Sequence, residues 1–157
     1  MKLLSADKDR YRFHLGRAEK TVLFALLRKY PLIPLAHHRL TRNATAQAPG
    51  DQALLDEAMS AQRVECQTRV QRLLASPDRF RARTDHLEIT FDREEIEWLL
   101  QVLNDIRVGS WIRLGCPEPE EDKPLLSSHP PKRPLVDMEL AGHFECRLLE
   151  ALHGPSE

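Results

Sequence analysis

The segment with the strongest potential for chemistry is LNDIRVGSWIRLG, residues 103–115, where polar side chains and two glycines interrupt an otherwise apolar helical pattern. A helix would place Asn104, Arg107 and Trp111 on one face, because they are three and four residues apart, with Asp105 nearer the opposite side. Asn and Asp are unusual inside a helix, because their side chains compete for backbone hydrogen bonds. The cluster therefore needs a structural or functional reason.

Two interpretations of this cluster stay open. In the first, it is a buried polar network that ties its helix to neighbours such as the polar middle of a helix at 51–75. In the second, it binds a ligand or a partner, or forms a small enzyme site, with Asn104, Asp105, Arg107, Trp111 and Arg113 as candidate residues. An ionised carboxylate near the core needs a cation or several hydrogen-bond donors. We therefore expect Asp105 to contact an arginine of another element, with Arg63 and Arg69 of the 51–75 helix as candidates.

The motifs of common catalytic and cofactor chemistries are missing from the sequence. It contains no GxGxxG or GxxxxGK[ST] phosphate loop, no GxSxG nucleophile turn, no HExxH and no CxxC. Glu139 and His143 are four residues apart, which is a metal-compatible spacing that is also common on solvent-exposed helices. We therefore expect no metal, no cofactor and a non-enzymatic protein.

Charge is distributed unevenly along the chain. Between residues 10 and 42 there are eight basic residues and one acid, a net +7, whereas residues 85–122 hold eleven acids and three arginines, a net −8. Either the two segments neutralise each other, within a chain or between protomers, or the basic segment binds nucleic acid. We favour neutralisation and expect no tight nucleic-acid binding, because no recognition motif accompanies the charge. The basic residues are Arg10, Arg12, Arg17, Lys20, Arg28, Lys29, Arg39 and Arg42.

Hydrophobic periodicity predicts two short strands and four helices. Apolar residues alternate at positions 10–15 and 86–91, and they follow a helical period near 17–30, 51–75, 93–114 and 135–153. Asp92 is a good N-cap, with Glu95 completing a capping box. The two strands should pair with each other and lie against the helices, because a lone ribbon is marginally stable in water. The predicted fold is mainly α: a four-helix bundle-like domain with a two-stranded β ribbon.

The two strand–helix units are alike at a spacing of 76 residues, which indicates either an internal repeat or the likeness of any two amphipathic units. The matching positions are Phe13, Leu15, Arg17, Glu19, Leu23 and Leu27 with Ile89, Phe91, Arg93, Glu95, Leu99 and Leu103. We treat residues 1–157 as a single domain. It contains one long loop at 116–134, where six of the eleven prolines gather.

The 103–115 segment also carries a resemblance to a known family. Its Leu-Asn-Asp-Ile-Arg run and its Arg-Leu-Gly ending resemble the helix signature of a small bacterial family of unknown function, best represented in actinobacteria, of which the chain would be a distant member. Ile112 replaces the family's small threonine. The resemblance implies a bacterial helical domain. Because genes of the family often lie near an adaptor of an ATP-dependent protease, it also implies a link to regulated proteolysis.

Composition limits the class of protein. The 41% hydrophobic and 30% charged fractions in 157 residues exclude a collagen-like or fully disordered chain, and no apolar run reaches the roughly 20 residues of a membrane span. Three widely separated cysteines indicate a reducing, cytoplasmic location. We expect a cytoplasmic interaction or adaptor-like domain that binds a protein partner or a second copy of itself. The alternatives are an enzyme or ligand site around Asp105 and nucleic-acid binding through residues 10–42.

Overall fold

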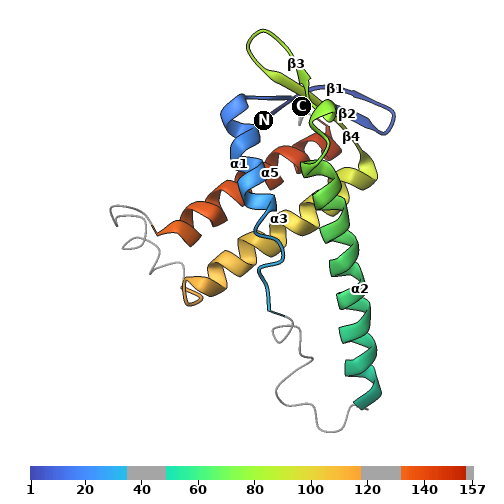
Figure 1. The fold of residues 1–157 in the computed structure, drawn as a ribbon, viewed down its shortest axis with the longest axis vertical. Helices are drawn as coiled ribbons and strands as arrows, with labels where there is room; N and C mark the ends of the chain where they lie inside the picture. Colours follow the sequence, from blue (N-terminus) through green and yellow to red (C-terminus); the bar gives the residue numbers. More distant parts are fainter. Residues whose placement is uncertain (35–48, 118–131, 155–157) are drawn as a thin grey trace.

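The computed structural model describes residues 1–34, 49–117 and 132–154, with only the backbone given for 49–52 (Figure 1). Arg39, Arg42 and most of the predicted 116–134 loop lie outside the described residues. The elements are, in order, β1 (Lys2–Asp7), β2 (Arg10–Leu15), α1 (Arg17–Leu27), α2 (Pro49–Leu74), the 3-10 turn η2 (Pro77–Arg79), β3 (Arg81–Ala82), β4 (Leu87–Asp92), α3 (Arg93–Arg113) and α5 (Arg133–His153).

The strands form a four-stranded antiparallel sheet in the order β1-β2-β4-β3. The prediction of a four-helix bundle with a two-stranded ribbon was therefore wrong, and the fold is α+β. The expected pair is present at the centre of the sheet as β2 and β4. The edge strands were missed for local reasons: in β1 the apolar residues do not alternate, because the exposed Leu4 follows Leu3 directly, and β3 has only two residues.

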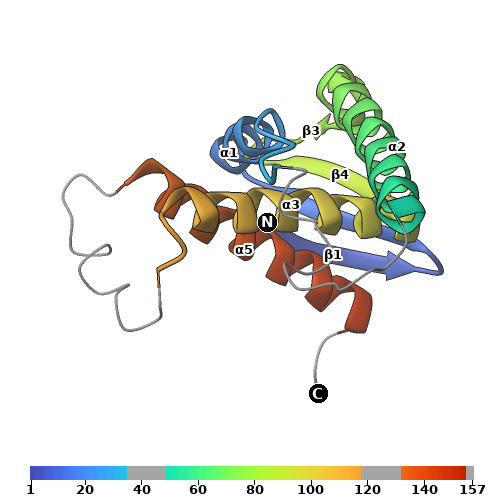
Figure 2. The same cartoon turned by 90° about the horizontal axis from the view of Figure 1, so that it is seen from below.

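The two faces of the sheet differ sharply. Phe13, Leu15, Ile89 and Phe91 point to one side and are almost completely buried, as the alternation predicted. Figures 1 and 2 show the helices gathered on that side, with α3 and α5 packed along each other. The opposite face carries exposed polar residues such as Arg12. No described helix covers it.

The four main helices lie where the periodicity predicted them, apart from shifts of a few residues at their ends. Helix α2 projects from the body of the molecule (Figure 1). From residue 53 onward, the buried side chains of α2 are Cys66, Val70 and Leu73, near its C-terminal end. Leu54 and Val64 are exposed, so the outer part of α2 contributes little to the core.

The two strand–helix units are related by an approximate twofold arrangement. Phe13 lies directly opposite Ile89 in the β2–β4 pair, the position 76 residues later. Gly16 and Asp92, also 76 residues apart, are the N-caps of α1 and α3. Each cap's backbone N–H donates to the third helical residue, Glu19 or Glu95, at 2.7 and 3.1 Å. The similarity therefore extends from side-chain type to register and capping geometry.

Candidate functional site

Asp105, the central residue of the sequence-predicted cluster, contacts the segment that follows α1. Its Oδ1 accepts hydrogen bonds from the backbone N–H groups of Leu32, at 2.6 Å, and Ile33, at 3.4 Å. Arg63 of α2, one of the expected partners, reaches the same segment and donates to the carbonyl oxygen of Ile33 at 2.8 Å. Asp105 is half-buried. The carboxylate and the arginine thus hold the 30–33 segment between α3 and α2.

Gly109 has a role at the same contact. A Cβ atom added there would lie 2.4 Å from Leu32 Cβ and 3.0 Å from the Leu32 carbonyl carbon, closer than real side chains allow. The glycine lowers the helix propensity of α3, but it lets the 30–33 segment approach the helix axis. Asp105 and Gly109, two of the irregular residues of the 103–115 segment, therefore both contribute to the contact with the 30–33 segment.

The remaining members of the cluster point elsewhere. Arg107 donates to Asn104 Oδ1 at 3.1 Å and pairs through Nε with Glu145 Oε2 of α5 at 2.9 Å. Burial raises the pKa of Glu145, and the Arg107 charge offsets part of this rise. Trp111 Nε1 donates to the carbonyl oxygen of Pro117 at 3.2 Å, and Arg113 is exposed. The five candidate residues do not converge on one point.

A small hollow does lie beside Asn104 and Asp105, between α2, α3 and the 30–33 segment, with a volume of about 200 Å³. It is smaller than the roughly 300–1,000 Å³ of typical ligand pockets. Tyr30 and Cys66 also line it. Burial raises the pKa of both side chains, so the thiol stays protonated and lacks the thiolate that nucleophilic catalysis requires. These features favour the structural interpretation of the cluster over the enzyme site.

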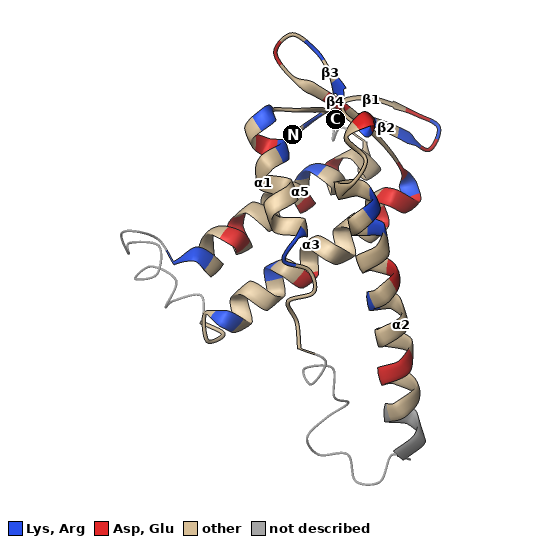
Figure 3. Cartoon of the chain, in the orientation of Figure 1, with Lys and Arg blue, Asp and Glu red and all other residues tan. Residues whose placement is uncertain are grey.

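The expected neutralisation of the basic segment by the acidic one is seen in part: β2 pairs with β4, which sets Arg10 opposite Asp92, and the Arg12 charge helps to lower the pKa of Glu88. Several direct ion pairs of the described acidic residues are formed with other arginines. Glu88, Glu94 and Glu95 form ion pairs with Arg83, Arg69 and Arg79, which lie between the two segments in sequence. Figure 3 shows acidic and basic residues interleaved over the hairpins and α2. In the basic segment, Lys29 pairs with Asp137 of α5. Among the described residues, Arg10, Arg12, Arg17 and Arg28 have no ion pair.

Two of these arginines, Arg17 and Arg28, line a groove between α1 and the β3–β4 end of the sheet. We call it the α1 groove; its lining residues are Arg17, Lys20, Thr21, Phe24, Arg28, Ala82 and Leu87, and its volume is about 530 Å³. Lys20 Nζ lies 4.2 Å from the ring centre of Phe80 and 5.3 Å from that of Phe24, and Arg28 Cζ lies 5.9 Å from the latter. The lining has three cations and no carboxylate. The groove therefore combines positive charge with an apolar floor.

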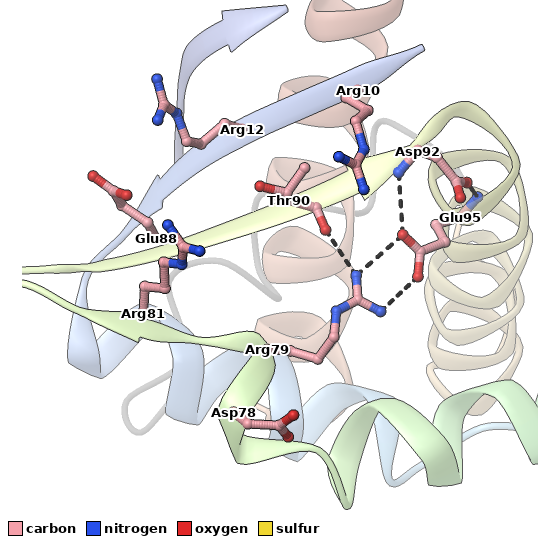
Figure 4. Close-up of a pocket in the computed structure, with 9 residues that line it drawn as sticks. All are labelled: Arg10, Arg12, Asp78, Arg79, Arg81, Glu88, Thr90, Asp92 and Glu95. Carbon is pink, nitrogen blue, oxygen red and sulfur yellow. Dashed lines mark hydrogen bonds and ion pairs between the residues drawn. The ribbon is translucent and has the colours of Figure 1, made fainter.

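A second hollow, of about 590 Å³, lies on the polar face of the sheet (Figure 4). We call it the sheet hollow; it is lined by Arg10, Arg12, Asp78, Arg79, Arg81, Glu88, Thr90, Asp92 and Glu95. Arg79 donates to both carboxylate oxygens of Glu95, at 2.6 and 3.1 Å, and to the carbonyl oxygen of Thr90 at 2.7 Å. These bonds join η2, β4 and the first turn of α3 into one fixed wall.

Sequence reasoning missed both hollows. The stripe Arg17, Lys20, Phe24 and Arg28 could have been recognised, because spacings of three and four place these residues on one face of a helix. The α1 groove also needs Ala82 of β3 and Leu87 of β4, and the sheet hollow combines residues of β2, η2, β3, β4 and α3. Only the tertiary structure brings these elements together.

Neither a metal cluster nor a membrane-spanning helix is found in the described part of the chain. No group of three His, Cys, Asp or Glu residues there could hold a metal ion, and Glu139 and His143 are both exposed on α5. None of the described helices is long and apolar enough to cross a bilayer. Comparisons with protein-family models, curated proteins and solved structures find no match. The resemblance of the 103–115 segment to a bacterial family therefore stays a prediction.

Proposed function

We propose that this protein is a non-enzymatic interaction domain that binds an acidic, partly apolar segment of a protein partner in the α1 groove. One observation carries the proposal: three cations line the groove around exposed or half-buried apolar side chains, and no carboxylate shares that lining. Charge complementarity of this kind speeds encounter and selects partners, while burial of an apolar side chain against Ala82 and Leu87 would supply affinity.

The floor of the α1 groove favours a protein over a nucleic acid. Proteins that bind single strands stack bases on open aromatic rings. Here Phe24 packs edge-on against Phe80, with ring centres 5.3 Å apart, and Lys20 and Arg28 lie over the Phe24 ring. The space in which a base would stack is therefore already occupied. Carboxylates of a peptide could still pair with the outer cations, Arg17 and Arg28, both of which are exposed.

We further propose a cytoplasmic location. It is supported by the three cysteines, Cys66, Cys116 and Cys146, all of which are free thiols. A link to regulated proteolysis and a bacterial source remain proposals that rest on the sequence resemblance of the 103–115 segment alone.

The test is a fluorescence-anisotropy titration with a short labelled peptide that carries several Asp and Glu residues around one Leu. We expect saturable binding at about 150 mM salt, weakening as salt is added, because the contacts are partly electrostatic. Reversing two exposed charges, in the Arg17→Glu and Arg28→Glu double variant, should weaken binding at least about tenfold. The matched control is Arg113→Glu, which changes an exposed arginine at the far end of α3 and should leave the affinity unchanged.

Two results would contradict the proposal. The first is equal peptide affinity in the wild type and in the double variant. The second is salt-dependent, sub-micromolar binding of a DNA or RNA oligonucleotide at about 150 mM salt, which would assign residues 10–42 to nucleic acid instead. A peptide in which Ser replaces the Leu separates the apolar contribution to binding from the electrostatic one. It should bind more weakly than the Leu peptide, because it leaves the apolar floor of the groove uncovered.

A further inference from the structure

We propose that the sheet hollow is a binding site for a small molecule that carries two or more phosphate groups. This site lies on the opposite face of the sheet from the helices, and the proposal is independent of the function proposed for the α1 groove.

The hollow presents hydrogen-bond donors that nothing in the described structure uses. Arg10, Arg12 and Arg81 are exposed, and within the described residues none of them forms an ion pair or a side-chain hydrogen bond. A guanidinium group offers a planar fork of N–H donors that matches the oxygens of a phosphate group. Figure 4 shows Arg10 and Arg12 projecting from β2, and Arg81 from β3 on the far side of β4.

Three of the four carboxylates that line the hollow, those of Glu88, Asp92 and Glu95, already accept hydrogen bonds. Both carboxylate oxygens of Glu95 accept hydrogen bonds from Arg79, and one of them also accepts from the backbone N–H of Asp92. Glu88 accepts from Arg83, which lies outside the hollow, at 2.9 Å, and this bond lowers the pKa of Glu88. The lining residues carry equal numbers of positive and negative charges, and the Arg12 charge also helps to lower the pKa of Glu88. The side chains of three of the four lining arginines nevertheless form no hydrogen bond with the described residues.

The wall of the hollow is fixed before any ligand arrives. Arg79 is held at three points by Glu95 and the Thr90 carbonyl oxygen, so η2 cannot move away from β4 without breaking charge-assisted bonds. The exposed hydroxyl of Thr90 lies on the floor, directly across from Arg12 in the β2–β4 register. A prearranged wall lowers the entropy that a ligand must lose on binding.

The spacing of the free arginines indicates more than one phosphate group. Arg10 and Arg12 are two residues apart on one strand, a rise of about 7 Å. Arg81 stands two strands away from β2, about 10 Å across the sheet, and the register places it level with His14, two residues beyond Arg12. One phosphate could bridge two of these guanidinium groups, but a second is needed to engage all three across that span. A diphosphate fits this arrangement better than a single oxyanion.

The borders of the hollow favour a small molecule over a polymer. Asp78 lies on the η2 side of the lining and Asp92 at the end of β4, so a phosphate backbone that ran past the arginines in either direction would meet a carboxylate. Like charges at such distances disfavour binding. The volume of about 590 Å³ lies within the range typical of small-ligand sites.

The test uses inorganic pyrophosphate, orthophosphate and a single-stranded oligonucleotide as probes in isothermal titration calorimetry at about 150 mM salt. We expect pyrophosphate to bind with a Kd below about 1 mM, and orthophosphate to bind at least about tenfold more weakly. Arg12→Gln and Arg81→Gln should each weaken pyrophosphate binding about tenfold or more. Both residues are exposed and lack ion pairs, so both variants should keep the wild-type melting temperature.

Two control variants keep the result specific. Arg113→Gln removes an exposed arginine far from the hollow, and Arg17→Gln removes one from the α1 groove; neither should change pyrophosphate affinity. The proposal is overturned if pyrophosphate fails to bind below about 1 mM, or if it binds Arg12→Gln and Arg81→Gln as tightly as the wild type. Oligonucleotide binding that is tighter than pyrophosphate binding, and that is lost in the same variants, would assign the hollow to nucleic acid and also overturn it.

Discussion

Asp105 and Gly109 lie one turn apart on α3 and contact the same two residues, Leu32 and Ile33. The carboxylate accepts the backbone N–H groups of both, and the missing side chain of the glycine leaves room for Leu32 Cβ. One residue thus satisfies the polar backbone of the 30–33 segment, and the other allows its close approach. This pair explains why a helix that faces the core carries two residues of poor helix propensity.

Gly109→Ala should destabilise the protein. Its Cβ would clash with Leu32, and the strain of overpacking, about 1–3 kcal/mol, should exceed the gain in helix propensity. The matched control is Gly142→Ala in α5, where the nearest atom is Arg107 Cδ at 3.7 Å. That variant should instead raise the free energy of unfolding by about 0.5–1 kcal/mol. Urea unfolding of both variants measures the difference, and equal effects of the two substitutions would contradict the close approach at Gly109.

Asp105→Ala should lower the free energy of unfolding by about 1–3 kcal/mol, because it leaves the N–H groups of Leu32 and Ile33 without this acceptor. Asp105→Asn should lose less, since its amide oxygen can still accept. Arg113→Ala, at an exposed position on the same helix, should change stability by no more than about 0.5 kcal/mol. If Asp105→Ala melts like the wild type but loses binding to a partner, Asp105 has a functional role and not a structural one.

Glu145 should make stability depend on pH. Burial raises its pKa in the folded protein above the unfolded value of 4.5, so folding binds the proton more tightly. The stability contributed by the protonated form is present at low pH and is lost as pH rises from about 4.5 through the higher folded pKa. Glu145→Gln cannot titrate. Its melting temperature relative to the wild type should therefore increase between pH 4 and pH 7, and a constant difference would show that burial does not perturb this carboxyl group.

The three thiols should react with a disulfide reagent in two groups. Cys116 and Cys146 are exposed, whereas Cys66 is buried and burial raises its thiol pKa. We expect two thiols to react rapidly at neutral pH and the third only when the protein unfolds. A denatured sample, in which all three react, calibrates the count. Rapid reaction of all three thiols in the wild type, or of two thiols in the wild type and only one in Cys66→Ala, would be inconsistent with the burial of Cys66.

The features that the sequence predicted correctly are those set by neighbours in the chain. The periodicity of apolar residues located the four main helices and the two central strands, because burial of one face imposes a period of 3.6 or 2. The capping box at Asp92 and Glu95 followed from residues three positions apart. Pairing of β2 with β4 was also predictable, because each strand had a single long candidate partner.

Contacts between segments that are distant in the sequence were decided only by the tertiary structure. The edge strands β1 and β3 carry little periodicity of their own and are held by pairing with β2 and β4. Asp105 accepts hydrogen bonds from backbone N–H groups more than 70 residues away, which no sequence pattern predicted, and its expected contact with an arginine stays a prediction. The α1 groove and the sheet hollow arise because sheet order places β4 and η2 beside β2 and α1. The periodicity of apolar residues shows which face of a helix or strand is buried, but it does not show which distant segment covers that face. The two hollows could therefore be found only in the tertiary structure.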